Sequence, residues 1–125
     1  MVECIFCQIV AGEIPSYKIY EDKEFLAFLD IFPKSEGHTL VIPKTHYSWV
    51  WDYPEPGKYF AVVTKIAKHL KKVSGQDVRG LVYGFDIPHA HVHLMPGKTN
   101  QFDGQQLSAE ELKKIQQVFT TVKNE

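Results

Sequence analysis

Three histidines alternate with small or apolar residues in the stretch IPHAHVHLMP, residues 87–96. Alternate side chains of a β-strand share a face, so His89, His91 and His93 would point one way while their neighbours enter the core. The outer two would lie about 13 Å apart on a straight strand. Two neighbours could reach one zinc ion, but all three could not without distortion, because zinc–nitrogen bonds are about 2.0–2.1 Å long. We therefore expect separate roles for the three, rather than one joint metal site or a chance cluster on an exposed face.

The segments around this strand predict an α+β fold. Residues 17–21 and 25–29 form a predicted hairpin with a charged turn, residues 38–43 a central strand, and GLVYGFD a strand before the triad. Apolar residues recur at three and four over residues 56–73, which indicates an amphipathic helix with a lysine-rich solvated face, ended by Gly75. Ser108, with Glu111 three residues later, is the predicted N-cap of a second helix over about 108–123. We expect an antiparallel sheet covered by helices on one side.

Length and composition predict a single domain over residues 1–125. The hydrophobic content of 44% and the charged content of 23% are ordinary for a globular protein. The net charge of −1, without a basic stripe, argues against a nucleic-acid groove, although a small nucleotide needs only a local site. No apolar run approaches the roughly 18–20 residues of a membrane span, and MVECIFCQIV lacks the features of a signal peptide. We expect a cytoplasmic protein with no membrane or nucleic-acid partner.

The two cysteines, Cys4 and Cys7, have the spacing at which both thiolates can bind one metal ion. Inert reduced thiols and a redox pair are the alternatives, but no βαβ pattern follows, as the redox motif requires. A zinc site would need two further ligands. The candidate ligands are His38, His46, His69 and His89. We expect His69 to be solvated on the lysine-rich helix and His46 to be a structural loop residue.

A histidine in the middle of the triad can act as a nucleophile or general base, since a neutral imidazole is competent near pH 7. Its other ring N–H needs an acceptor, which fixes the tautomer. A neighbouring histidine can donate hydrogen bonds to an anion such as a phosphate. The local sequence identifies no partner carboxylate, although Asp86 lies three residues before the triad.

The stretch HAHVHLM resembles the His-x-His-x-His signature of the histidine triad (HIT) family. IFCQIVAGEIPSYKIYEDKEFLAFLDIFPKSEGHTLVIPKTH is similar over its length to the N-terminal half of the histidine-triad nucleotide-binding proteins, so the resemblance covers residues 4–46 and 86–96. It implies a five-stranded antiparallel sheet with two helices, in a homodimer whose sheets join into ten strands. It also implies a hydrolase or transferase acting at the α-phosphorus of a purine nucleotide phosphoramidate or dinucleoside polyphosphate. A non-catalytic nucleotide-binding protein and a metal-dependent hydrolase are the alternatives.

The same resemblance assigns roles to residues. His91 would attack the α-phosphorus to form a nucleotidyl-histidine that water cleaves, His93 would hold the phosphoryl oxygens, and the His89 carbonyl would orient the His91 ring. Asp30 would bind the ribose hydroxyls of an AMP- or GMP-type nucleotide. The apolar base pocket, whose members could equally be core residues, would comprise Ile14, Phe28, Leu29 and Ile31.

Bacterial-type relatives carry a zinc ion held by a CxxC pair, the histidine of a GHTLV segment and the first triad histidine. The corresponding residues here are Cys4, Cys7, His38 and His89. A complete Cys₂His₂ set leaves no open coordination position. The resemblance thus implies a structural zinc that ties the N-terminal segment to the sheet and takes no part in the reaction.

The segment before the triad departs from the family pattern. Gly84 is present, but Phe85 stands where glutamine is usual and Asp86 where a hydroxyl residue is common, and the preceding loop is shorter. A phenyl ring cannot hydrogen-bond a phosphate, and an ionised Asp86 in the substrate site would repel one. We expect altered nucleotide affinity and leaving-group handling. Trp49 and Trp51 are expected to be packing residues rather than an interface or a pocket cap.

Overall fold

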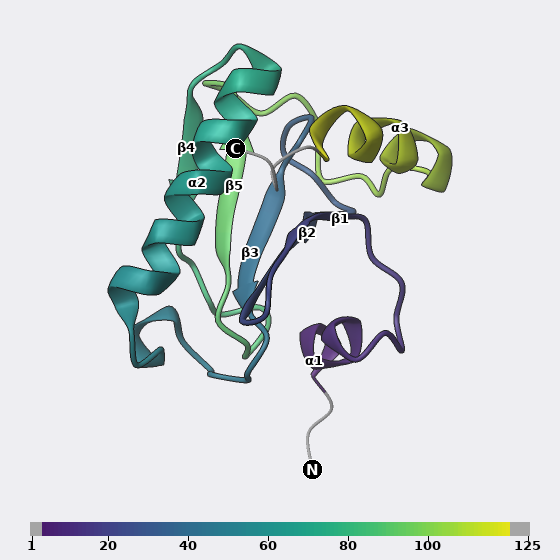
Figure 1. Ribbon diagram of the computed structural model, residues 1–125. Coiled ribbons are helices and arrows are strands. Elements are labelled where there is room, and N and C mark those ends of the chain that lie inside the picture. Colours follow the sequence, from purple (N-terminus) through teal and green to yellow (C-terminus); the bar gives the residue numbers. More distant parts are fainter. Residues whose placement is uncertain (1–3, 121–125) are drawn as a thin grey trace.

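The chain folds around one antiparallel sheet, seen in a computed structural model that describes residues 4–120 (Figure 1). Its strands lie in the order β1-β2-β3-β5-β4, which confirms the predicted α+β class and five-stranded sheet. The strands are β1 (Lys18–Glu21), β2 (Phe25–Leu29), β3 (Thr39–Pro43), β4 (Val78–Leu81) and β5 (Val92–Pro96). The helices are α1 (Ile5–Val10), α2 (Pro56–Ser74) and α3 (Ala109–Phe119), with one 3₁₀ turn, η1 (Val50–Asp52).

Both faces of the central strands are buried. Every residue of β2 and β3 is buried, and alternate residues enter two separate apolar clusters because successive side chains point to opposite faces. One cluster includes Ala27, Val41 and Leu94 and receives the apolar faces of α2 and α3. The other includes Phe28 and Leu40 together with residues of α1. The expectation of helices on one side only was therefore wrong: α1 is a third helix and packs on the opposite face.

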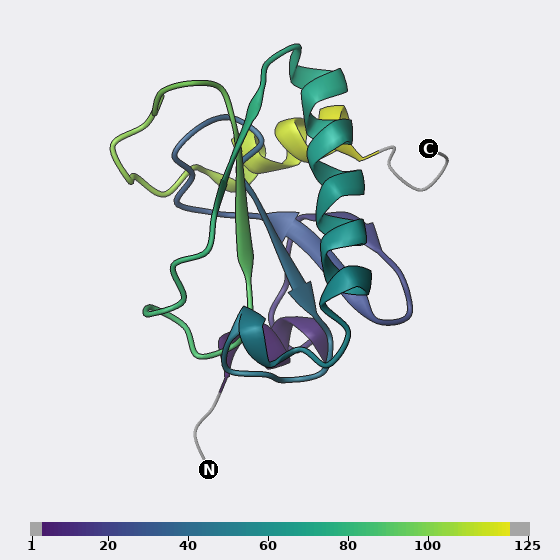
Figure 2. The same cartoon turned by 90° about the vertical axis from the view of Figure 1, so that its left-hand side faces the viewer.

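The two cysteines lie at the start of the short helix α1, where the first caps the backbone of the second. Cys4 is the N-cap, and its sulfur accepts a hydrogen bond from the Cys7 backbone N–H at 3.4 Å. Phe6 and Ile9, three residues apart, then share one face of the helix and are buried against the sheet. Figure 2 shows α1 close to one end of the sheet and α3 at the other.

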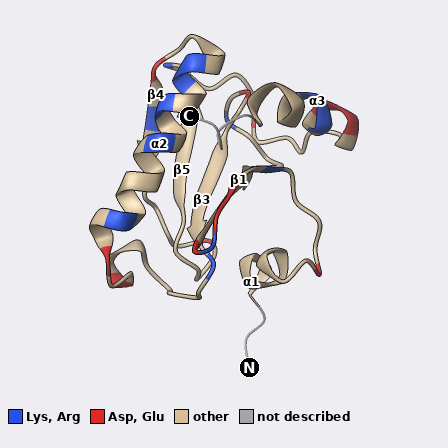
Figure 3. Cartoon of the chain, in the orientation of Figure 1, with Lys and Arg blue, Asp and Glu red and all other residues tan. Residues whose placement is uncertain are grey.

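Helix α2 has the predicted amphipathic character and ends at Gly75, whose φ of 71° is the left-handed C-cap conformation. Its lysines lie mainly on the outer side (Figure 3). His69 is an exception to the predicted solvated face: it is buried, and its Nε2–H donates to the carbonyl oxygen of Phe119 at 2.7 Å. The prediction that His69 is solvated was wrong because the C-terminal end of α3 packs against this turn of α2.

Helix α3 begins at the predicted cap. The Ser108 hydroxyl accepts from the Glu111 N–H, and the Glu111 carboxylate accepts from the Ser108 N–H, both at 3.1 Å. The helix ends at Phe119 within the described part of the chain, and residues 121–123 of the predicted helix lie outside it. Among the described residues, no helix is long and apolar enough to cross a membrane.

The strand predicted at GLVYGFD, residues 80–86, was displaced and too long: β4 begins two residues earlier, at Val78, and the chain leaves the sheet after Leu81. Gly84 has a φ of +80°, and a Cβ added there would lie 2.4 Å from Cζ3 of Trp49. Phe85 packs edge-on against the same indole, with ring centroids 5.1 Å apart. Trp49 is therefore a packing residue, as predicted, but Trp51 is 71% exposed and is not.

Candidate functional site

A hollow of about 460 Å³ opens on the face of the sheet that carries α1, a volume within the range of small-molecule sites. It brings together every residue predicted to bind substrate. These residues are Ile14, Phe28, Leu29, Asp30, Ile31, Asp86 and His93, and His91 joins them. Phe28 belongs at the same time to the apolar cluster under α1, and Leu29 to the core under α2. Phe85 is not among the lining residues of the hollow, because its ring packs on Trp49.

The three triad histidines face the hollow side as the alternation predicts, while Ala90, Val92 and Leu94 lie in the core under α2. His89 and His91 precede the first residue of β5, yet their rings keep the same side. Phe6 of α1 makes edge contacts with both, at centroid distances of 5.8 and 5.3 Å. The rings of His91 and His93 are 5.0 Å apart. Helix α1 thus forms one wall of the site.

His91 has a defined tautomer. Its Nδ1–H donates to the carbonyl oxygen of His89 at 2.8 Å, which is the contact expected from the resemblance. Because a neutral imidazole carries one proton, Nε2 then keeps a free lone pair. The ring is 4% exposed and lines the hollow. His91 can therefore present a basic, nucleophilic nitrogen to a ligand in the hollow.

A chain of hydrogen bonds also determines the tautomer of His93. The Lys34 backbone N–H donates to Nδ1 of His38 at 2.9 Å, so the His38 proton is on Nε2. That nitrogen lies 3.0 Å from Nδ1 of His93 and donates to it. His93 must then carry its own proton on Nε2, which is the donor an anion requires.

Burial keeps this pair neutral. Burial, followed by the neighbouring His93, lowers the pKa of His38 to about 3. Burial, followed by the neighbouring His91, lowers the pKa of His93 to about 4. Both imidazoles are therefore uncharged near pH 7. Lys34 then donates to His38, and His38 donates to His93, as described above.

Asp30 lies beside this pair at the exit of β2. Its Oδ1 accepts from the Phe32 N–H at 2.8 Å, while Oδ2 lies 3.6 Å from Nε2 of His38. Burial raises the pKa of Asp30 because a desolvated carboxylate is disfavoured. Oδ2 makes no short hydrogen bond to these neighbours and can accept one from a ligand hydroxyl. Lys34, which sequence reasoning missed, also lines the hollow.

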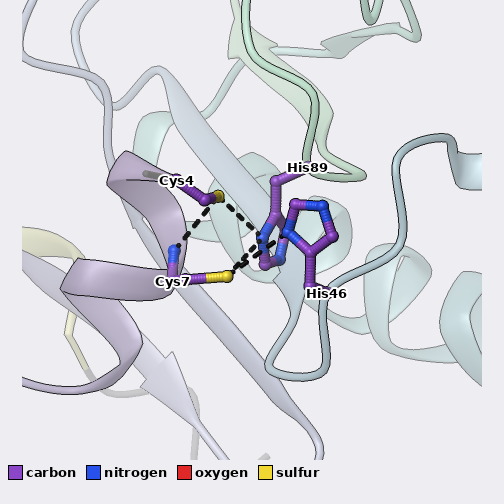
Figure 4. A group of neighbouring side chains, drawn as sticks. All are labelled: Cys4, Cys7, His46 and His89. Atoms are coloured by element: carbon purple, nitrogen blue, oxygen red, sulfur yellow. Dashed lines mark hydrogen bonds between the residues drawn. The ribbon is translucent and has the colours of Figure 1, made fainter. Parts of the chain in front are cut away.

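A second cluster, at the α1 end of the sheet, contains Cys4, Cys7, His46 and His89 (Figure 4). Nδ1 of His89 lies 3.3 Å from the Cys4 sulfur and 3.5 Å from the Cys7 sulfur. Nδ1 of His46 lies 3.3 Å from the Cys7 sulfur. Nε2–H of His89 donates to the Pro43 carbonyl at 2.8 Å, which leaves its Nδ1 lone pair directed at the sulfurs. The structure thus brings together three of the four predicted metal ligands.

His38 lies outside this cluster, contrary to the prediction, and His46, which the sequence assigned to a structural role in a loop, takes the fourth place in it. Strand β3 runs antiparallel to β5, with Leu40 opposite His93 and Val41 opposite Val92. The start of β3, with His38, therefore meets the end of the triad. The residues after β3, with His46, meet its beginning at His89. The sequence predicts an antiparallel sheet but not which strands pair in it, so a match of sequence motifs does not distinguish His38 from His46 as the fourth member.

The Cys₂His₂ cluster has the donor chemistry of a structural zinc site. Bonds of about 2.3 Å to sulfur and 2.0–2.1 Å to nitrogen in a tetrahedron put sulfur and nitrogen roughly 3.5 Å apart, close to the distances seen. Burial, with hydrogen bonding and charge repulsion from Cys4, raises the pKa of Cys7 to about 11, so two bare thiolates would be disfavoured here. A divalent cation would remove that repulsion.

Asp30, His38 and His93 also have donor atoms within 4.8 Å of one another. There, however, the facing nitrogens of the two imidazoles share a 3.0 Å hydrogen bond. A metal ion would have to break that bond. The group of Asp30, His38 and His93 is therefore arranged to hydrogen-bond an anion rather than to bind a metal ion.

Comparisons with known proteins all indicate the same family. The HIT domain matches residues 11–100 of this chain. An adenosine 5′-monophosphoramidase of Saccharomyces cerevisiae is 40% identical over 99 residues, which are 74% of this chain and 61% of that protein.

Two solved structures share the fold. The crystal structure of a hypothetical histidine triad nucleotide-binding protein from Sulfolobus tokodaii has a TM-score of 0.85 and 31% identity, covering 95% of this chain and 91% of that one. A zinc-bound histidine triad family protein from Mycobacterium smegmatis has a TM-score of 0.74 and 31% identity, covering 96% and 92%.

Proposed function

Because the chain belongs to the HIT domain family, we propose that it is a hydrolase or transferase of purine nucleotide derivatives with His91 as nucleophile. The observation that carries the proposal is the hydrogen bond from Nδ1–H of His91 to the His89 carbonyl, which leaves Nε2 free to attack. The name of the yeast relative, a monophosphoramidase, supports a phosphoramidate as the substrate class.

The hollow has a separate place for each part of a nucleotide. Apolar side chains from α1 to the end of β2, with Ile14, Phe28 and Ile31 among them, suit a purine base. The free Oδ2 of Asp30 suits the ribose hydroxyls. The α-phosphoryl group then reaches His91, and Nε2–H of His93 donates to one of its oxygens. This donor faces charge that grows as the phosphorus becomes five-coordinate.

The reaction takes two displacements at phosphorus. In the first, the Nε2 lone pair of His91 forms a bond to the α-phosphorus, the phosphorus–nitrogen bond breaks, and the departing amine takes a proton from water. In the second, a water molecule attacks the nucleotidyl-histidine, its proton passes to solvent, and Nε2 regains its lone pair. These two steps give ammonia and the nucleotide monoanion, and transfer of the remaining phosphate proton to ammonia gives nucleotide dianion and ammonium ion. Phosphoramidate monoanion plus water thus balances these products in atoms and in charge.

Turnover of an adenosine phosphoramidate by wild type and by His91→Asn tests this proposal. Removal of a nucleophile costs at least about 1,000-fold in kcat when the rest of the site is intact. Calorimetric titration with AMP should show that the variant still binds nucleotide, so that the loss is one of chemistry. Equal turnover by the two proteins would refute the role of His91.

One observation favours a second candidate, a nucleotide-binding protein without turnover. Asp86 places a carboxylate in the hollow, where it opposes an incoming phosphate. Phe85 does not affect a phosphate in the hollow, because its ring does not line it. AMP and GMP bound tightly, with no phosphoramidate or dinucleoside polyphosphate turned over, would identify this alternative.

We also propose one structural zinc ion per chain, held by Cys4, Cys7, His46 and His89. Bound there, it would supply two thiolate and two imidazole bonds that join α1 to the segments flanking β3 and β5. The zinc-bound relative supports this assignment. Elemental analysis should find one zinc per chain. Chelation should lower the melting temperature, because the metal binds the folded state only. Loss of turnover on chelation with the melting temperature unchanged would instead indicate a catalytic metal.

A homodimer joined through β4 is a further part of the proposal. The sheet edge at β1 contacts α3, and Gln116 donates to the Lys18 carbonyl there at 3.0 Å. The opposite edge, β4, carries Leu81, which is 46% exposed. Pairing of two β4 strands would produce the ten-stranded sheet. Light scattering should give twice the mass of the chain. Leu81→Asp should reduce it to one chain, while Val118→Asp, at an exposed position on α3, should not.

A further inference from the structure

The Asp86 carboxylate has no task in the two displacements described above, yet it lies in the reaction hollow. It lines the hollow together with Tyr83 and Ile87, on the segment that connects β4 to the triad. It also acts electrostatically on His93, raising the pKa of that imidazole against the larger effect of burial. Asp86 is therefore near His93, the side chain that donates a hydrogen bond to the phosphate, and it is exposed to solvent.

The chain just before Asp86 packs against Trp49. Gly84 passes directly under the Trp49 ring, where a Cβ would lie 2.4 Å from Cζ3. Phe85 packs on that indole and also on Tyr83, with centroids 5.1 and 5.3 Å apart. Phe85 is 74% exposed and does not line the hollow, whereas the next side chain, Asp86, does.

The order of the strands indicates which part of a substrate Asp86 meets. The base and ribose residues are at the β2 side, His91 and His93 belong to the β5 segment, and β4 lies beyond β5. A nucleotide with its base at the β2 side and its phosphorus at His91 has its leaving group directed toward β4 or toward the opening of the hollow. Asp86 follows β4 in the chain and is exposed at the opening, so it meets the leaving group in either case.

The charges of the hollow disfavour an anionic leaving group. Among the described residues that line it, the charged side chains are Asp30, Lys34 and Asp86, and burial lowers the pKa of His38 and of His93 so that both are neutral. A polyphosphate leaving group brings several negative charges and would meet one lysine and a carboxylate. An amine leaving group becomes an ammonium ion, which a nearby carboxylate attracts.

We propose that Asp86 is a specificity-determining residue that selects nucleoside phosphoramidates whose amine portion carries a positive charge. This inference rests on the proposed function and adds the class of leaving group. The chemistry remains hydrolysis of the phosphorus–nitrogen bond: one water is consumed, and the products are the nucleoside monophosphate and the protonated amine. The attraction acts on the charged end of that amine, both before and after the bond breaks.

Three adenosine 5′-phosphoramidates of matched length test the proposal. Their amines are 1,4-diaminobutane, which keeps a distal ammonium, butylamine, which is uncharged at that end, and γ-aminobutyrate, which is anionic. Wild type should show kcat/KM falling by about two- to fivefold at each step, which is the upper part of the range that ion pairs to exposed side chains reach. Diadenosine tetraphosphate should be the poorest substrate. The differences should shrink as salt rises, because Asp86 is exposed.

Two variants connect the ranking to one side chain. Asp86→Asn should bring the three phosphoramidates within about twofold of one another, and Asp86→Lys should reverse their order. Asp77→Asn is the matched control, since Asp77 is an exposed aspartate just before β4 that pairs with Lys71 and does not line the hollow. It should leave the wild-type ranking unchanged. Melting temperatures of all variants should agree within a few degrees.

The outcomes separate this inference from the function it rests on. Equal kcat/KM for the three compounds in wild type, or a ranking that persists in Asp86→Asn, would overturn the role of Asp86 and leave the phosphoramidase proposal intact. Absence of turnover for all four compounds would overturn both.

Discussion

His38 makes two hydrogen bonds, one from the Lys34 N–H and one to Nδ1 of His93, and different replacements of His38 remove them selectively. The Oδ1 atom of an asparagine branches from Cγ as Nδ1 of histidine does, so His38→Asn can still accept from the Lys34 N–H. It has no donor that reaches His93. The Nε2 atom of a glutamine lies one bond further out, so His38→Gln can still donate to Nδ1 of His93. His38→Ala loses both bonds, of 2.9 and 3.0 Å.

The two bonds predict different losses. An orphaned Lys34 N–H costs about 1–3 kcal/mol, and the buried site of His38 adds a cavity, so His38→Ala should lose about 2–4 kcal/mol of unfolding free energy. His38→Asn should lose about 1 kcal/mol. For turnover, the bond to His93 becomes charge-assisted as the phosphoryl oxygens gain charge, worth about 1.5–3 kcal/mol. At 1.36 kcal/mol per tenfold, kcat should fall by roughly 10- to 150-fold.

The assay is kcat and KM for an adenosine phosphoramidate, combined with urea unfolding of each variant. We expect His38→Asn to be nearly as stable as wild type but slow, and His38→Gln to be the faster of the two. A structural role alone would make turnover follow stability. The reasoning is refuted if His38→Asn turns over substrate as fast as wild type, or faster than His38→Gln.

Three further predictions concern the pH dependence of stability, the zinc ligands and the packing at Gly84. The pKa values of His38 and His93, about 3 and 4 in the folded chain, lie below the ordinary value of 6.5. The unfolded chain therefore binds more protons than the folded chain between pH 6.5 and 4, so the unfolding free energy should fall as the pH falls through this range. With two histidines the slope is at most about 2.7 kcal/mol per pH unit. Urea unfolding at several pH values should show this slope in wild type and a smaller one in His38→Asn. His46→Ala should abolish the stoichiometric zinc measured by elemental analysis, whereas His38→Asn should keep it; zinc lost from the second variant and kept by the first would contradict the ligand assignment. Gly84→Ala should destabilise by at least about 2 kcal/mol, because a side chain at its φ of +80° is strained and meets Trp49, while Gly57→Ala, an open position in α2, should not destabilise; equal midpoints in urea for the two would count against that packing.

Local patterns in the sequence predicted local features of the structure well. The capping box at Ser108 and the Gly75 end of α2 depend on residues within a few positions of one another, and both are present. The alternation in HAHVHLM likewise separated the triad from Ala90 and Val92. These features need only the geometry of one element, which short-range sequence contains.

The errors concern contacts made between elements. His38 and His46 flank the same strand, and only its antiparallel register with β5 decides which of them meets His89 and which meets His93. His69 was assigned from its own helix, whereas its partner is the Phe119 carbonyl at the end of α3. The motif predicts an effect of Phe85 on phosphate binding, but its ring packs on Trp49 and does not line the hollow. In each case a residue distant in sequence determined the outcome.

The stereochemical course at phosphorus tests the central claim, nucleophilic catalysis by His91, most directly. An adenosine phosphoramidothioate of known configuration at phosphorus is hydrolysed in ¹⁸O-water, and the configuration of the thiophosphate product is determined. Two in-line displacements, through a nucleotidyl-histidine on Nε2 of His91, predict retention of configuration. Inversion would mean that water attacks the phosphorus directly, and would contradict the role of His91 as nucleophile.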